Sequence, residues 1–150
     1  MNYTTERKMS KDFESFLKTN VGATFFKEVQ GLFGIPDYVY FEKNKDEVNI
    51  VSFELKLTNW KQAMIQAFRY RGFSDQVYVV MPEDAIERAI VHSDQFETYG
   101  IGLASFSPNC FSIVISAQKH TPYSQTLREK MMERVKRSRK KSACTSYFAV

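Results

Sequence analysis

The sequence predicts an α/β fold in a single domain. The chain has 150 residues, of which 43% are hydrophobic and 15% aromatic, which is enough for one sizeable core and too short for two ordinary domains. A strand pattern at 48–57, a helix pattern at 60–72 and a second strand pattern at 76–81 follow one another. This order is typical of a βαβ unit, whose two strands lie parallel in one sheet.

The first half of the chain predicts one helix and three strands. Apolar residues recur at helical spacing between 11 and 19, behind Ser10 as a possible N-cap. A strand is expected at 23–30, ended by Gly31 and by the turn at 34–36, and a second strand at 38–41. After a charged turn at 42–47, alternation makes 48–57 the clearest strand, with Ser52, Glu54 and Lys56 on one face.

The second half predicts two long helices, a strand pair and a basic helix. Thr58 or Asn59 can cap the helix at 60–72, and Pro82 ends the apolar strand at 76–81. A helix at 84–98 should end before Gly100, followed by strands at 101–106 and 111–116. A basic helix then carries Leu127, Met131 and Val135. We expect one domain over 1–141 and a flexible tail at 142–150.

Charge and cysteine content exclude some classes of function. The formal charge is +4, but the segment 134–141 alone holds six basic residues and no acidic ones, so the excess is local. Cys110 and Cys144 lie far apart without nearby histidines, which argues against a zinc cluster or a disulfide framework. No apolar run reaches the roughly 18 residues that span a bilayer. We therefore expect a cytoplasmic protein with free thiols and no membrane segment.

Three charged residues form the most informative pattern. Asp37 begins a strand after a Gly-Ile-Pro turn, and Glu54 and Lys56 lie on one face of the next strand, about 6.6 Å apart. If the two strands pair as an antiparallel hairpin, both carboxylates and the ammonium group share one small volume. Carboxylate oxygens are the ligands that Mg²⁺ prefers, and Lys56 could orient or deprotonate an attacking water.

These residues resemble the signature of a known group of enzymes. Pro36-Asp37 followed by Glu54-Leu55-Lys56 is similar to the motif of the PD-(D/E)xK, or restriction-endonuclease-like, nuclease superfamily. The resemblance continues through the helix that carries Trp60, Gln66-Ala67 and Tyr70 and through the strand at 77–82, so that it covers 23–82.

The resemblance implies a fold and a catalytic centre. The implied fold is a restriction-endonuclease-like α/β/α sandwich with a mixed central sheet. The implied activity is a Mg²⁺- or Mn²⁺-dependent endonuclease or other phosphodiesterase that acts on nucleic acid, with DNA as the expected substrate. Asp37, Glu54 and the backbone carbonyl of Leu55 would bind the metal, Lys56 would be catalytic, and Gln66 would support them.

The resemblance leaves a third acidic ligand and the assembly open. Many members use an earlier glutamate, and here Glu28 on the preceding strand and Glu14 on the first helix both qualify; Glu28 is preferred. Small nucleases of this fold often need two copies to cut both strands. A homodimer, or a place in a larger complex, is therefore expected.

Each of these residues also has a simpler interpretation. Lys56 could form a structural ion pair with Asp37 or Glu54, and Asp37 could serve only the turn. Glu6-Arg7-Lys8 also fits Glu-x-Lys, but in a polar segment where solvated charges are expected.

Further basic and aromatic residues could contact nucleic acid. Lys61 and Arg69 on the second helix, and Arg134 and Arg137 in the basic run, are candidates for phosphate contact, although each set could be a solvated face. The rings of Trp60, Phe68 and Tyr70 fit a core better than a base-stacking platform. The alternative function is a non-catalytic module that binds nucleic acid or another protein through a nuclease-like fold.

Overall fold

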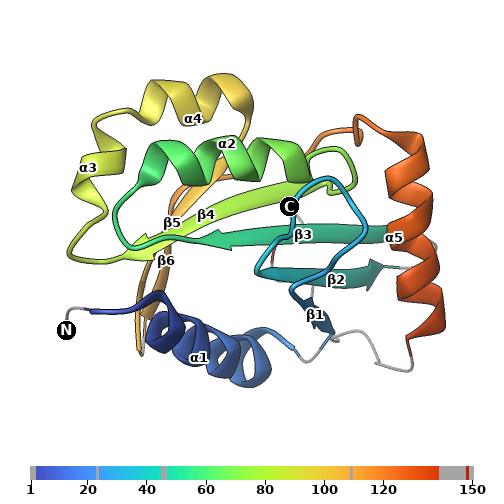
Figure 1. Ribbon diagram of the computed structural model, residues 1–150, viewed down its shortest axis with the longest axis horizontal. Coiled ribbons are helices and arrows are strands. Elements are labelled where there is room, and N and C mark those ends of the chain that lie inside the picture. Colours follow the sequence, from blue (N-terminus) through green and yellow to red (C-terminus); the bar gives the residue numbers. More distant parts are fainter. Residues whose placement is uncertain (1–2, 23, 45–46, 109, 139–147, 149–150) are drawn as a thin grey trace.

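The structure is a computed structural model that describes residues 3–22, 24–44, 47–108, 110–138 and 148 (Figure 1). Six strands form one sheet in the order of the sequence. They are β1 (Phe25–Lys27), β2 (Tyr38–Asn44), β3 (Glu47–Leu55), β4 (Gln76–Pro82), β5 (Gly102–Ser107) and β6 (Cys110–Ile115). The helices are α1 (Glu6–Phe16), α2 (Trp60–Tyr70), α3 (Glu87–Ile90), α4 (Ser93–Tyr99) and α5 (Gln125–Arg137), with a π-helical turn η1 (Leu17–Val21) after α1.

The sheet is mixed, and its centre is parallel. Strands β1, β2 and β3 pair antiparallel, β3 pairs parallel to β4 and β4 to β5, and β6 returns antiparallel. Helix α2 connects β3 to β4, which confirms the predicted βαβ unit. The hairpin register places Tyr38 opposite Phe53, so Asp37 lies beside the end of β3 that carries Glu54.

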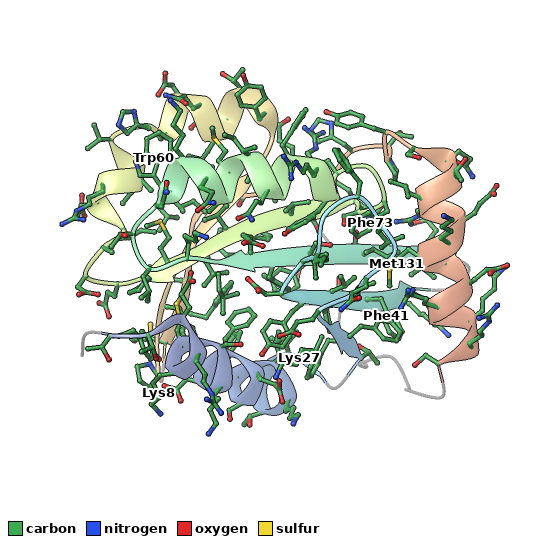
Figure 2. All side chains as sticks on the ribbon, viewed as in Figure 1. Lys8, Lys27, Phe41, Trp60, Phe73 and Met131 are labelled. Carbon is green, nitrogen blue, oxygen red and sulfur yellow. The ribbon has the colours of Figure 1, made fainter. Side chains whose placement is uncertain are left out.

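Helices cover both faces of the sheet (Figure 1). Helix α1 packs on one face, where Met9, Phe13 and Leu17 are fully buried against the aromatic side chains of β2, β3 and β5. Helices α2 to α5 cover the other face. There Phe41, Phe73 and Met131 lie close together between the sheet and α5 (Figure 2). The predicted α/β fold is therefore confirmed as a mixed sheet flanked by helices.

The first helix begins earlier than the sequence interpretation placed it. Thr5, and not Ser10, is the N-cap, and its side-chain oxygen accepts a hydrogen bond from the backbone N–H of Lys8. The reason is the stripe Met9, Phe13 and Leu17, at i, i+4 and i+8, which can be buried only if the helix includes Met9. The first turn of α1 thereby reaches Glu6.

Two further elements differ from expectation. The strand predicted at 23–30 is shortened to β1, because the backbone of Glu28 adopts a positive φ of 50°, which leaves the extended conformation. The helix predicted at 84–98 is instead two short helices, α3 and α4. They are separated at His92, whose ring stacks on Trp60 at a centroid distance of 4.3 Å. The helix is therefore interrupted at His92, where the ring contacts Trp60 of α2.

The turn predicted at 42–47 is shorter than expected, because β2 continues to Asn44 and β3 begins at Glu47, so that Glu42 and Lys43 pair within the sheet. The other elements follow the sequence interpretation closely. Asn59 caps α2, Gly100 ends α4 with a left-handed backbone, and α5 buries Met131 and Val135. Strand β3 ends at Leu55, two residues before the predicted end. Of the predicted tail, only Phe148 lies among the described residues, and its ring is buried against Tyr40, Phe53 and Tyr78. No helix within the described ranges is long and apolar enough to cross a membrane.

Candidate active site

Asp37 is held in place by the end of strand β3. Its backbone N–H donates to the carbonyl oxygen of Phe53 at 3.1 Å, and its Oδ2 accepts from the backbone N–H of Leu55 at 2.8 Å. The turn before it carries Gly34 with a φ of 82°, where an added Cβ would lie 2.8 Å from the Tyr70 ring. Glycine therefore lets this turn lie against α2, and the carboxylate of Asp37 is fixed beside the strand that carries Glu54.

Glu54 is a buried carboxylate on the face of the sheet that α2 covers. It is only 5% exposed. Its Oε1 lies 2.6 Å from the hydroxyl of Tyr70, and the same hydroxyl lies 3.1 Å from the carbonyl oxygen of Ile35. Tyr70 comes from the last turn of α2, so this helix, strand β3 and the turn before Asp37 meet at one hydroxyl group.

A cavity of about 680 Å³ brings together six residues that the sequence analysis singled out. These are Glu28, Asp37, Glu54, Leu55, Lys56 and Gln66. Lys56 lies just beyond the end of β3, where its backbone N–H donates to the carbonyl oxygen of Val80. The remaining lining comes from α1 together with Lys27 and Ile35. The predicted convergence of Asp37, Glu54 and Lys56 is present.

Burial raises the pKa of both carboxyl groups, and the charge of Asp37 raises that of Glu54 further. Burial, opposed by the hydrogen bond from Leu55, raises the pKa of Asp37 to about 6. Burial and then the nearby charge of Asp37 raise the pKa of Glu54 to about 8. Near neutral pH, therefore, the two carboxyl groups hold about one proton between them, unless a cation enters and offsets both charges.

The ion-pair interpretation of Lys56 is wrong. None of the ion pairs between described residues joins Lys56 to Asp37 or Glu54, although its positive charge lowers the pKa of both. Lys56 thus leaves the two carboxylates without a direct counterion. The buried negative charge is available to a bound cation.

The oxygen donors fit a magnesium-type ion. The buried Oε1 of Gln66 has no hydrogen-bond partner, and it lines the same cavity as both carboxylates. Over the described part of the chain, no group of three or more His, Cys, Asp or Glu side chains could hold a metal. Mg²⁺ keeps several waters and commonly binds proteins through one or two carboxylates, so two acidic residues with neutral oxygens suffice.

The structure separates the two candidates for a third acidic residue. Glu28 lines the cavity, and its charge contributes to the raised pKa of Asp37. Glu14 does not line the cavity; it forms ion pairs with Lys18 at 3.1 Å and Lys27 at 3.4 Å. Burial raises the pKa of Glu14, but these contacts and the Tyr38 hydroxyl lower it overall. Glu14 therefore serves the packing of α1 and not the site.

Glu6 is the functional candidate that the sequence interpretation set aside. It lines the cavity from the first turn of α1, and its charge raises the pKa of both Asp37 and Glu54. The missed signal was the Met9, Phe13 and Leu17 stripe, which extends the helix back to this residue. Arg7 and Lys11 enter the cavity lining for the same reason.

The four residues expected to contact phosphates lie elsewhere. Lys61 and Arg69 face a separate apolar groove on α2. On α5, Arg134 donates to the carbonyl oxygen of Gln30 and Arg137 pairs with Glu133 at 3.4 Å. The cations that do line the cavity are Arg7, Lys11, Lys27 and Lys56.

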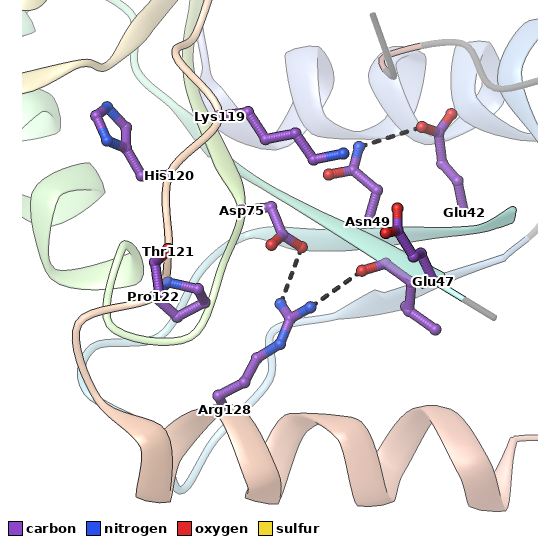
Figure 3. Close-up of a pocket in the computed structure, with 10 residues that line it drawn as sticks. Glu42, Glu47, Asn49, Asp75, Lys119, His120, Thr121, Pro122 and Arg128 are labelled. Atoms are coloured by element: carbon purple, nitrogen blue, oxygen red, sulfur yellow. Dashed lines mark hydrogen bonds and ion pairs between the residues drawn. The ribbon is translucent and has the colours of Figure 1, made fainter.

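A second polar pocket lies at the opposite end of β3 (Figure 3). Its lining contains an ion pair: Arg128 binds the carboxylate of Asp75 at 2.9 Å, and it also donates to the carbonyl oxygen of Val48 at 3.0 Å. Asp75 also accepts from the backbone N–H of Ile50 at 2.7 Å. These contacts fix α5 to the sheet. The carboxylate of Asp75 has a paired cation, whereas the carboxylates of Asp37 and Glu54 have none among the described residues.

The fold and the site define an α/β protein with a six-stranded mixed sheet and a cavity at the end of its β2–β3 hairpin. We call it the acidic cavity after its two buried carboxyl groups, Asp37 and Glu54. The structure is similar to that of the SPO1766 protein of unknown function from Silicibacter pomeroyi, with a TM-score of 0.56 and 13% sequence identity. The match covers 91% of this chain and 86% of that one, and it shows the fold alone. No family model matches the sequence. None of the curated proteins matches it either.

Proposed function

We propose that this protein is a divalent-metal-dependent nuclease of the PD-(D/E)xK type that hydrolyses phosphodiester bonds in DNA. One observation carries the proposal: the carboxylates of Asp37 and Glu54 lie in one cavity with raised pKa values and without a paired cation. Perturbed carboxylates that converge in a cavity are typical of metal and catalytic sites.

The chain supplies the groups that this chemistry needs. Asp37, Glu54 and the backbone carbonyl of Leu55 would hold Mg²⁺ or Mn²⁺, and the unpartnered Gln66 oxygen lies in the same cavity. When bound, such an ion polarises the phosphate and lowers the pKa of a bound water. Lys56 would orient the attacking water or remove its proton.

The other cations of the cavity support a polyanionic substrate. Arg7 and Lys11 project from α1, and Lys27 comes from β1 on the neighbouring side. Arg7, Lys11 and Lys27 are suited to contact the phosphates that flank the cleaved bond, because Lys and Arg supply most backbone contacts to nucleic acid. Beside the cleaved bond, they take the role that the sequence analysis gave to Lys61, Arg69, Arg134 and Arg137.

A cleavage assay with matched variants tests the proposal. Plasmid DNA, single-stranded DNA and RNA are incubated with the wild type in Mg²⁺, in Mn²⁺ or in EDTA. Metal-dependent cutting is expected, with loss in Asp37→Asn and wild-type activity in Glu14→Gln, which removes a carboxylate outside the cavity. If no substrate is cut in either metal, or if Asp37→Asn cuts as fast as the wild type, the proposal is wrong.

One observation favours a second function, a non-catalytic nucleic-acid-binding module. Four cations, Arg7, Lys11, Lys27 and Lys56, line the cavity and are suited to hold a phosphate backbone whether or not it is cut. A protein that kept the fold without catalysis would bind nucleic acid tightly and with strong salt dependence, yet leave it intact. The same assay, combined with a binding measurement in EDTA, separates the two functions.

A further inference from the structure

An apolar groove of about 650 Å³ lies on the outer side of α2, apart from the acidic cavity. Helix α4 and the segment that leads into α5 form its other walls. Four aromatic rings line it, from Phe33, Phe68, Tyr99 and Tyr123. We call it the aromatic groove.

Its rings are unusually exposed for residues of this size. Phe33 is 57% exposed, Tyr99 is 45% and Tyr123 is 61%. The ring of Phe68 lies 5.4 Å from that of Tyr99 and 5.6 Å from that of Tyr123, the latter edge to face. Exposed apolar surface concentrated in one groove is typical of a binding site, because a ligand that covers the rings removes them from water and so lowers the free energy.

The charges of the groove favour a polyanion as the occupant. Both charged side chains in its lining, Lys61 and Arg69, are cationic. The guanidinium of Arg69 lies over the Phe33 ring, 5.4 Å from its centroid, so that one face of this ring carries a cation. Aromatic faces interleaved with Lys and Arg are what single-stranded nucleic acid requires, with bases on the rings and phosphates on the cations.

One short segment borders both the aromatic groove and the acidic cavity. Phe33 lines the groove and Ile35, two residues later, lines the cavity. The same segment leads directly to Asp37, and the Tyr70 hydroxyl ties it to α2 through the carbonyl oxygen of Ile35. A strand whose backbone enters the cavity can therefore continue over this segment into the groove.

We propose that the aromatic groove stacks unpaired bases of the nucleic acid, so that the substrate carries a single-stranded segment beside the bond that is cut. The proposal rests on the nuclease function proposed above and names its substrate class. In a duplex the base faces are already stacked on each other, so only an unpaired strand offers them to Phe33, Tyr99 and Tyr123.

Binding in EDTA tests the inference without any need for cleavage. The anisotropy of a fluorescein-labelled single-stranded oligonucleotide is compared with that of its blunt duplex, for the wild type and for Phe33→Leu, Tyr99→Leu and Tyr123→Leu. Leucine keeps an apolar side chain but removes the stacking face. The control is Val91→Ala, because Val91 is 76% exposed and lies outside the groove.

Tighter binding of the single strand is expected, together with a loss of about tenfold in its affinity for at least one leucine variant and no change in the control. Thermal unfolding confirms that each variant is folded. Equal affinity for single strand and duplex, unchanged affinity in all three variants, or no binding at all would overturn the inference. The leucine variants could instead change the sedimentation coefficient of the free protein and leave its affinity for the single strand unchanged. That result would show that the aromatic groove is a protein–protein interface and would overturn the inference.

The two proposals fail in different ways. Cleavage lost in Asp37→Asn with unchanged affinities in the leucine variants would support the nuclease and overturn the stacking role. Binding lost in the leucine variants with no cleavage by the wild type would support the stacking role and overturn the nuclease.

Discussion

The hydroxyl of Tyr70 lies 2.6 Å from Oε1 of Glu54, and both groups are almost completely buried. The hydrogen bond from a neutral phenol favours the charged carboxylate and lowers its pKa, against the larger effect of burial. Burial and the nearby Glu54 charge in turn raise the pKa of Tyr70, so the phenol remains the donor. Tyr70 therefore tunes the protonation of Glu54 and also fixes its orientation.

Tyr70→Phe should move the pH dependence of cleavage. Without the hydroxyl the pKa of Glu54 rises further above 8, so the ionised form that binds metal appears only at higher pH. The acid limb of kcat/KM is expected to shift to higher pH, with about a tenfold loss of activity at neutral pH. Tyr78→Phe is the matched control, because its buried hydroxyl accepts from the backbone N–H of Ala117 and lies outside the cavity. An unshifted acid limb in Tyr70→Phe would contradict this role.

Glu54→Gln should stabilise the metal-free protein at alkaline pH. The folded-state pKa of Glu54 is raised to about 8 from its ordinary value of 4.5, so its stabilising contribution is present below pH 4.5 and is lost as pH rises through 8. The amide never ionises and escapes this loss. In EDTA at pH 9 its Tm should exceed that of the wild type by on the order of 5 °C, with a smaller difference at pH 5.

Thermal unfolding across this pH range, with and without Mg²⁺, checks the prediction. Mg²⁺ should raise the Tm of the wild type more at pH 9 than at pH 5, because the ion binds the ionised carboxylates, and it should raise the Tm of Glu54→Gln much less. A constant difference between the two proteins from pH 5 to 9 would show that Glu54 is not a buried titrating group.

Glu6→Gln and Glu14→Gln should differ although both residues lie on α1. The charge of Glu6 raises the pKa of Asp37 and Glu54, whereas Glu14 is engaged with Lys18 and Lys27. Glu6→Gln should shift the acid limb of the cleavage profile to lower pH and weaken metal binding a few-fold. Glu14→Gln should leave both unchanged. Identical pH profiles for Glu6→Gln and the wild type would remove Glu6 from the site.

Lys56→Ala should abolish cleavage while sparing metal binding. Lys56 lines the cavity but has no ion pair with either carboxylate, so its removal leaves the proposed metal ligands in place. The loss expected for an acid–base or water-orienting group is on the order of 10²–10⁴-fold in kcat. Arg7→Ala is the comparison, because a phosphate-contacting cation should raise KM more than it lowers kcat. Full activity in Lys56→Ala would defeat its assignment.

Arg128→Ala should destabilise the fold without touching the site. Arg128 forms the ion pair with Asp75 and donates to the carbonyl oxygen of Val48, so its loss leaves a mostly buried carboxylate without its counterion and removes a donor to a backbone carbonyl (Figure 3). Urea unfolding should show a loss of about 3 kcal/mol. Metal affinity should stay within twofold of the wild type at a temperature where the variant is folded. A marked loss of metal affinity would mean that the two ends of β3 are coupled.

The sequence predicted those residues of the candidate site that lie on neighbouring strands. Alternation along β3 and the turn before Asp37 are local signals, and together they placed Asp37, Glu54 and Lys56 around one volume. The hairpin register and the parallel pairing with β4 then followed the expected pattern. Local rules sufficed because a strand fixes the direction of every second side chain.

The sequence could not predict contributions that depend on packing between distant segments. Glu6 reaches the cavity only because α1 crosses the sheet face next to Asp37, and no local pattern encodes that crossing. Phe68 packs against the core as expected, but it also lines the aromatic groove with Tyr99 and Tyr123, far along the chain, and no local pattern predicted that. The split between α3 and α4 likewise depends on the contact of His92 with Trp60.

Isothermal titration of Mg²⁺ and Mn²⁺ into the wild type, Asp37→Ala and Glu14→Gln at pH 8 tests whether Asp37 and Glu54 form a metal centre. We expect saturable metal binding by the wild type and Glu14→Gln, and at least tenfold weaker binding by Asp37→Ala. The reason is that Asp37 lines the same cavity as Glu54, whereas Glu14 does not line it. Equal binding by the wild type and Asp37→Ala, or no saturable binding by the wild type, would show that these carboxylates are not a metal centre.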